Sequence, residues 1–200
     1  AGADAIGLVS AKRSPRYVEP TTARAIAFAA KPFVQTVGLF VDPPAEMARL
    51  DDLLPAVDCW QWHGSIDAKH LHAANNAGRR IILAMSYHPD QAEQQLRTFE
   101  QWATQYPCIG GLIVDHFDAT GVGGGTGQSF DWSGLRDVID RVQPTLPIIL
   151  AGGLNPDNVA EAIRIVQPYA VDVSSGVESE RGKKDPAKIR AFCEAVRQPS

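Results

Sequence analysis

Short apolar runs alternate with longer amphipathic stretches along the whole chain, and this alternation is the feature that most limits its possible folds. β-rich segments that alternate with helical ones predict repeated βα units around a parallel sheet, an α/β fold. The predicted strands are Ala5 to Ser10, Gln35 to Val41, Cys59 to His63, Ile81 to Met85, Gly111 to Asp115, Ile148 to Ala151 and Ala170 to Val173. The predicted helices are Thr21 to Ala30, Ala45 to Leu54, Ile66 to Ala77, Asp90 to Gln105, Trp132 to Val142, Pro156 to Ile165 and Pro186 to Val196.

Seven βα units are one short of a closed TIM (β/α)8-type barrel, which needs eight. The first residues, Ala1-Gly2-Ala3-Asp4, are typical of the end of a helix, with Gly2 as its left-handed cap. One interpretation is that the first strand and helix are missing at the N-terminus, and another is that the domain begins with an irregular segment. We expect a single β/α barrel domain over residues 1–200, with seven of eight units visible.

Composition excludes several classes of partner. Hydrophobic residues make up 44% of the 200 residues and the formal net charge is −4, with lysines and arginines scattered along the chain. No basic face for nucleic acid and no apolar run of about 18 residues for a membrane is visible. The three cysteines, Cys59, Cys108 and Cys193, have long spacings that suit reduced thiols in the cytoplasm better than disulfides or a zinc site. We also expect neither a secretory signal nor an anchor.

Two glycine-containing turns directly follow the last two predicted strands. Gly152-Gly153 follows the strand that ends at Ala151, and Ser175-Gly176 follows the strand that ends at Val173. In barrels of this kind, phosphate is often bound after the seventh and eighth strands by backbone N–H groups near a helix N-terminus. These turns therefore predict a phosphate site, although the residues of both are also compatible with ordinary turns.

Three other segments are candidates for chemistry. A glycine-rich loop at Gly121–Gln128 lacks a nucleotide-binding signature and predicts a mobile cover over the site. Asp115 ends a predicted strand, where a carboxylate either caps the loop or acts on substrate. Arg16, in Ser14-Pro15-Arg16-Tyr17-Val18, has the geometry to hold a carboxylate, although an arginine in a loop is usually a solvated surface charge.

With these segments in view, the chain resembles the phosphoribosylanthranilate isomerases, enzymes of tryptophan biosynthesis. The resemblance covers essentially the whole chain, and its segments occur in the family's order. They are Ile6-Gly7-Leu8-Val9, Ser14-Pro15-Arg16-Tyr17-Val18, Val37-Gly38-Leu39-Phe40-Val41, Gln61-Trp62-His63-Gly64, Gly124-Gly125-Thr126-Gly127 with Phe130-Asp131-Trp132, Gly152-Gly153-Leu154-Asn155-Pro156 and Val171-Asp172-Val173-Ser174-Ser175-Gly176-Val177-Glu178.

The resemblance implies an aldose-ketose isomerase that performs an Amadori rearrangement without metal or organic cofactor. A general acid opens the furanose ring to a Schiff base, and a general base then removes the C2 proton. By motif position, Asp115 is the acid and Arg16 holds the anthranilate carboxylate, while His63 and Asp172 line the substrate pocket. Gly152, Gly153, Ser175 and Gly176 bind the phosphate. Asp115 needs a raised pKa for this role, and Asp118 is the nearest carboxylate in sequence. The expected state is a monomer or homodimer.

The general base is the point where this sequence departs from the family. The family takes the base from a cysteine in a Lys-Ile-Cys-Gly segment, which these 200 residues do not contain. We interpret Cys59, Cys108 and Cys193 as structural, whereas His63 or His116 could accept a proton. The alternative hypothesis is a catalytically impaired barrel that binds a phosphorylated ligand. A third, indoleglycerol phosphate synthase, is disfavoured by the Gly-Gly-Thr-Gly and Phe-Asp-Trp segments.

Overall fold

A computed structural model describes residues 2–44, 46–54, 56–116 and 131–198 of the chain. The chain forms two compact units. The N-terminal unit comprises Ala3–Ala84 and Ala103–Gly110, and the C-terminal unit comprises Ala1–Gly2, Met85–Trp102 and Gly111–Ser200. Single-domain organisation therefore stays a prediction.

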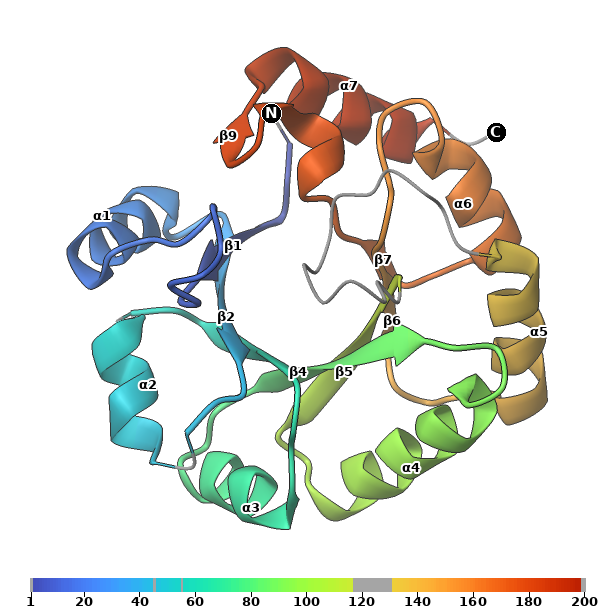
Figure 1. Cartoon of the computed structure of the whole chain (residues 1–200), viewed down its shortest axis with the longest axis horizontal. Coiled ribbons are helices and arrows are strands. Elements are labelled where there is room, and N and C mark those ends of the chain that lie inside the picture. Colours follow the sequence, from blue (N-terminus) through green and yellow to red (C-terminus); the bar gives the residue numbers. More distant parts are fainter. Residues whose placement is uncertain (1, 45, 55, 117–130, 199–200) are drawn as a thin grey trace. The chain divides into compact units, whose positions relative to one another are not determined.

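Strands and helices alternate as the sequence predicts (Figure 1). The parallel strands are β1 (Ala5–Val9), β2 (Gln35–Val41), β3 (Cys59–His63), β4 (Ile81–Tyr87), β5 (Ile109–His116), β6 (Ile148–Leu150) and β7 (Ala170–Val171), in sequential order. The helices are α1 (Pro20–Ala30), α2 (Met47–Leu53), α3 (Ala68–Asn76), α4 (Ala92–Gln105), α5 (Trp132–Val142), α6 (Val159–Val166) and α7 (Pro186–Arg197). Sequence reasoning missed a 3-10 turn, η1 (Ser175–Val177), and a hairpin of β8 (Glu178–Glu180) and β9 (Lys183–Lys184).

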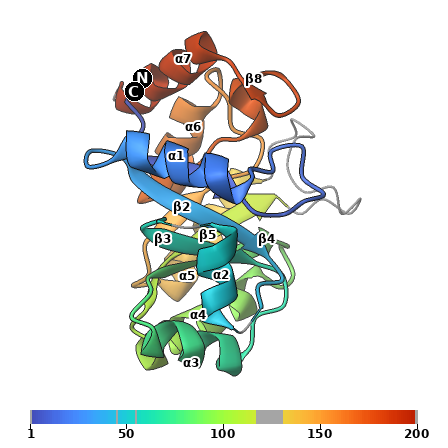
Figure 2. The ribbon, with the colours of Figure 1, turned by 90° about the vertical axis from the view of Figure 1, so that its left-hand side faces the viewer.

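The N-terminal unit is built on parallel pairing of β1 through β4. Ala5 pairs with Gln35 and Val41 pairs with His63, so β2 and β3 end side by side. Trp60 and Trp62 alternate with half-buried residues on β3 and are fully buried, so they are packing residues. Their rings are stacked with centroids 6.1 Å apart. Figures 1 and 2 show α1, α2 and α3 on one side of these strands. These helices cover the outer face of the strands.

The C-terminal unit pairs β5 with β6 and β6 with β7. Leu112 lies opposite Ile148, and Leu150 lies opposite both Val114 and Val171. Helices α5 and α6 pack on these strands through apolar stripes that are fully buried. The buried helical residues are Leu135, Val138, Val159, Ala162 and Val166. This packing fixes the positions at which the loops after β5, β6 and β7 begin.

Polar side chains cap the N-termini of several helices, among them α3, α5 and α7. Asp67 and His70 form a reciprocal capping box at the start of α3, with the His70 N–H donating to Asp67 Oδ1 over 3.1 Å. Asp185 accepts N–H bonds at the start of α7, and Pro186 follows at the first helical position. Helix α6 begins at Val159, later than the predicted Pro156. In the described part of the chain, no helix is long and apolar enough to cross a membrane.

Candidate active site

Backbone hydrogen bonds align the C-terminal ends of β5, β6 and β7 in the C-terminal unit. The Ala151 N–H donates to the Val114 carbonyl, and the Asp172 N–H donates to the Leu150 carbonyl, both over 2.8 Å. Asp115 follows Val114 directly, and the glycine turn follows Ala151 directly. The ends of parallel strands therefore place Asp115, Gly152 and Asp172 at the same edge of the sheet.

Asp115 and Asp172 act on each other electrostatically. The pKa of Asp172 is raised to about 6, mainly by burial among protein atoms and next by the charge of Asp115, while Lys184 opposes the shift. Asp172 is nevertheless exposed to solvent as a residue, so the carboxyl is crowded by protein atoms but accessible. Asp115 lies one residue before the end of β5, and β7 ends at Val171, so the predicted strand ends were each slightly wrong.

The carboxylate expected beside Asp115 was Asp118, which lies outside the described residues, as does the glycine-rich loop at 121–128. Asp172 is instead a neighbouring carboxylate that the structure supplies. Sequence alone favoured Asp118 because it is close along the chain. The electrostatic interaction with Asp172 depends on β6 lying between β5 and β7.

The turn after β6 requires its two glycines. Gly152 and Gly153 have φ values of 84° and 69°, a left-handed region that favours glycine. Asn158 stabilises the turn because its side-chain oxygen accepts from the Asn155 N–H over 2.8 Å and its Nδ2 donates to the Gly153 carbonyl over 3.0 Å. The backbone N–H groups of this turn are thereby held in one conformation, as an anion-binding turn needs.

The second predicted phosphate turn lies directly against the first. Ser175 and Gly176 belong to η1, a single 3-10 turn rather than the tip of an α-helix. A Cβ atom at Gly176 would overlap the Leu154 carbonyl oxygen and would lie 2.9 Å from the Leu154 carbonyl carbon. The two turns are therefore in contact through their main chains, and glycine is required at Gly176 by close approach.

The sequence did not predict that Lys184 and Glu178, on the β8–β9 hairpin, support the second turn. Lys184 Nζ donates to the Ser174 carbonyl over 2.7 Å and lies 3.1 Å from Glu178 Oε1. Gly182, with a φ of 85°, allows the chain to reverse between β8 and β9. The Arg181-Gly182 pair between short polar segments was a turn signal, but nothing in the sequence showed where the Lys184 side chain would reach.

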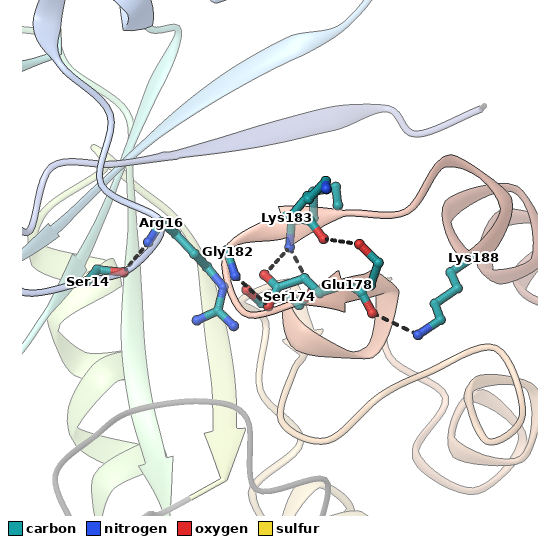
Figure 3. Close-up of polar contacts among 9 residues, drawn as sticks. Ser14, Arg16, Ser174, Glu178, Gly182, Lys183 and Lys188 are labelled. Atoms are coloured by element: carbon teal, nitrogen blue, oxygen red, sulfur yellow. Dashed lines mark hydrogen bonds and ion pairs between the residues drawn. The ribbon is translucent and has the colours of Figure 1, made fainter.

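In the N-terminal unit, Arg16 lies in an ordered loop after β1 and is half-buried rather than a fully solvated charge. The Arg16 N–H donates to Ser14 Oγ over 3.1 Å (Figure 3), and the Val18 N–H donates to the Val9 carbonyl over 3.0 Å. The loop thus folds back on the strand that precedes it, and these bonds fix the backbone that carries the Arg16 side chain.

His63 ends β3, as predicted, and is half-buried. Its Nε2 lies 2.7 Å from Nε2 of Gln61, and burial lowers the pKa of His63 to about 4. The imidazole is therefore neutral near pH 7, and with Gln61 as donor its Nε2 is the acceptor. Arg16 and His63 belong to the N-terminal unit, so their predicted approach to Asp115 and Asp172 stays a prediction.

The three cysteines form no disulfide. Cys59 donates its thiol to the Trp60 carbonyl over 3.5 Å, and burial raises its pKa to about 11. Cys108 and Cys193 are buried. These surroundings fit the interpretation of all three as structural residues. Among the described residues, no group of three or more histidine, cysteine, aspartate or glutamate side chains has the geometry to hold a metal ion.

Comparisons with known proteins agree with this arrangement. Residues 1–195 match the family model of N-(5'-phosphoribosyl)anthranilate (PRA) isomerase. A relative from Pseudomonas fluorescens, N-(5'-phosphoribosyl)anthranilate isomerase, is 46% identical over 200 residues, which are 99% of this chain and 87% of the relative.

Two solved structures share the fold. One is phosphoribosyl anthranilate isomerase in complex with reduced 1-(o-carboxyphenylamino)-1-deoxyribulose 5-phosphate, with a TM-score of 0.79 and 30% identity over 98% of this chain and 88% of that one. The other is a monomeric form of the dimeric isomerase from Thermotoga maritima, with a TM-score of 0.74 and 29% identity over the same shares. The fold is thus of the TIM-barrel type, and the chain belongs to the N-(5'-phosphoribosyl)anthranilate isomerase family.

Proposed function

We propose that this chain catalyses the Amadori rearrangement of N-(5-phosphoribosyl)anthranilate to 1-(2-carboxyphenylamino)-1-deoxyribulose 5-phosphate in tryptophan biosynthesis. Family membership supports the reaction. The single observation that carries it within the chain is a pair of interacting carboxylates, Asp115 and Asp172, at the sheet edge where the two glycine turns begin. A phosphorylated sugar that must open its ring needs an anion site and a proton donor at the same edge.

The glycine turns are proposed to bind the phosphate. Gly152, Gly153 and Gly176 present backbone N–H groups without side chains that would keep an anion away. Ser175 adds a hydroxyl that can donate to a phosphate oxygen. A solved relative was crystallised with a ligand that carries a 5-phosphate, which supports a phosphate site in this family.

Asp115 is proposed as the general acid. It donates a proton to the furanose ring oxygen, the C1–O bond breaks, and the electron pair of the anthranilate nitrogen forms the Schiff base. Two nearby carboxyls resist simultaneous ionisation, because the charge on one raises the pKa of the other. Asp172 is such a neighbour, so the pair retains a proton closer to neutral pH than an isolated aspartate does.

In the N-terminal unit, Arg16 is proposed to bind the anthranilate carboxylate through two N–H donors, and neutral His63 to line the substrate pocket. A general base then accepts the C2 proton, which gives an enolamine that tautomerises to the ketone; the family's source of this base is the Lys-Ile-Cys-Gly segment, which these 200 residues do not contain. Cys59 is not proposed as the base for that step because the raised pKa keeps it as a thiol. No cofactor enters the proposal.

The proposal is tested by following the loss of phosphoribosylanthranilate fluorescence in the 200-residue chain and in an Asp115→Asn variant. General acid catalysis contributes about 10² to 10⁴ in rate, so the variant should lose at least about a hundredfold in kcat. Asp137→Asn, at an exposed position on α5, is the matched control and should stay within about twofold. An Asp115→Asn variant with normal turnover would remove Asp115 as the acid.

A second candidate function is binding of the phosphorylated ligand without turnover. The observation in its favour is that the family's Lys-Ile-Cys-Gly segment, the expected source of the base, does not occur in these 200 residues. Isothermal titration with the product decides between the two. Product binding with activity at least about a hundredfold below an intact relative supports this second function, whereas full activity supports the isomerase and rules out the assignment of the base to that segment.

Two further proposals concern assembly and compartment. A monomer or homodimer is proposed, since a relative is described as dimeric and was also obtained as monomers. Sedimentation equilibrium measures this directly, and a larger oligomer would contradict it. The cytoplasm is the proposed compartment because the cysteines are free thiols, which fits a reducing environment. Fractionation of cells that express the gene tests it.

A further inference from the structure

Glu178 is a charged residue in an unusual position. Only 5% of its side chain is exposed, yet it follows the predicted phosphate turn by two residues. A buried carboxylate is costly unless it is paired, and here it would also repel a bound phosphate. A cation beside Glu178 is therefore needed both for folding and for anion binding.

Lys184 supplies that cation and contacts the turn at the same time. Its Nζ lies 3.1 Å from Glu178 Oε1 and donates to the Ser174 carbonyl over 2.7 Å. The Gly182 N–H donates to the other carboxylate oxygen of Glu178 over 3.1 Å. Lys188 Nζ donates to the Glu178 carbonyl over 2.7 Å, so both lysines approach the same residue (Figure 3).

The Ser174 contact determines the orientation of the turn. The Ser174 carbonyl and the Ser175 N–H belong to the same peptide plane, so fixing the oxygen also fixes the direction of that N–H group. The Ser175 N–H is thereby added to the backbone N–H groups of Gly152, Gly153 and Gly176 as a donor to the phosphate. Gly176, packed against the Leu154 carbonyl, anchors the other side of the same turn. The turn is thus held at two points, one of which is a side chain.

We propose that Lys184 is a positioning residue for phosphate binding, which fixes the Ser174–Gly176 turn through the Ser174 carbonyl and neutralises Glu178 behind it. The inference rests on the proposed function, because it requires that this turn binds phosphate. It goes beyond that function by assigning a role to the β8–β9 hairpin. The hairpin does not contact the ligand itself but orients the turn that binds it.

Lys183 provides a matched control on the same strand. Its Nζ pairs with Glu180 Oε1 at 2.9 Å, and both side chains are about 70% exposed, so its ion pair lies in solvent. Lys184→Met removes the donor with little change of length, Lys184→Arg restores a charged donor, and Lys183→Met removes a charge at the neighbouring position. For each variant, KM, kcat, the inhibition constant of inorganic phosphate and the thermal midpoint are measured.

Lys184→Met should raise KM and the phosphate inhibition constant by about tenfold, the size of one hydrogen bond to a charged group. Its kcat should change by less than about threefold, because Lys184 does not touch the reacting atoms and its charge is the smallest of the influences on the pKa of Asp172. Lys184→Arg should recover much of the loss, and Lys183→Met should resemble the wild type. A structural defect alone would lower the thermal midpoint and the active fraction without this separation of KM from kcat.

Different results would overturn the role of Lys184 and the phosphate site on which that role depends. If inorganic phosphate inhibits the wild type and Lys184→Met equally, Lys184 does not position the turn, although the phosphate site stands. If phosphate does not inhibit the wild type, the phosphate site is wrong and the inference falls with it. Should Lys184→Met fail to fold, Lys184→Gln keeps a neutral donor and should show a smaller rise in the inhibition constant. A wild-type constant in that variant would also overturn the inference.

Discussion

Gly176→Ala is the substitution for which the structure makes the sharpest prediction. The added methyl carbon would overlap the Leu154 carbonyl oxygen and would lie 2.9 Å from the Leu154 carbonyl carbon and 3.0 Å from Asn155 Cα. Ordinary carbon–carbon contacts are about 3.5 to 4.0 Å, so the two turns must separate by at least about 0.5 Å. Both sides of the contact are main chain, and no flexible side chain can move out of the way.

The expected cost has two components. Overpacking of a well-packed contact destabilises a protein by about 1 to 3 kcal/mol, which corresponds to about 2 to 12 °C in the thermal midpoint of a chain this long. Displacing the turn also moves the backbone N–H groups proposed to hold the phosphate. Misplacement of a bound group by about 1 Å costs up to about a hundredfold in rate, so kcat/KM should fall by about ten- to a hundredfold.

Gly7→Ala is the control, because a Cβ at Gly7 on β1 has no neighbour within 4 Å. Differential scanning calorimetry gives the thermal midpoint, and inhibition by inorganic phosphate reports the turn directly. We expect Gly7→Ala to match the wild type in both measurements, while Gly176→Ala loses stability and phosphate affinity together. A Gly176→Ala protein with the wild-type midpoint and inhibition constant would refute the contact between the turns.

Three further predictions concern ionisation and capping. Because the pKa of Asp172 is raised to about 6, its ionisation destabilises the fold as pH rises from about 4 through 6. In urea titrations the stability of Asp172→Asn relative to the wild type should therefore increase over this pH range and level off above it, and a difference that stays constant from about pH 4 to 7 would contradict the raised pKa. Cys59→Ser should keep at least about half of the fluorescence-assayed activity, since a thiol with a pKa of about 11 is protonated at neutral pH; a hundredfold loss would refute its structural role. Asp67→Ala should lower the free energy of unfolding by about 1 kcal/mol by removing the capping box with His70, and an unchanged urea midpoint would argue against that cap.

The elements of the fold were predictable because their signals are local. Apolar runs and amphipathic stretches specified the seven strands of the parallel sheet and the seven α-helices of the described chain, and the glycines at Gly152 and Gly153 marked a turn that needs positive φ. The β8–β9 hairpin was missed because two- and three-residue strands carry little periodicity. The start of α6 was set too early because Pro156 favours a first helical position, whereas Asn155 and Asn158 close a separate turn before Val159.

Sequence by itself determined the fold class, the family and the residue types that carry the proposed chemistry, since periodicity, turn residues and motif order are properties of neighbouring positions. Only the tertiary structure decided which of these residues meet. Asp115 interacts with Asp172, a carboxylate far away in the sequence, because β6 lies between their strands and sets the register. Proximity along the chain had pointed to Asp118 instead. Likewise, Lys184 reaches Ser174 and Gly176 touches Leu154 because packing brings together positions that are 10 and 22 residues apart, a distance over which sequence pattern specifies no contact.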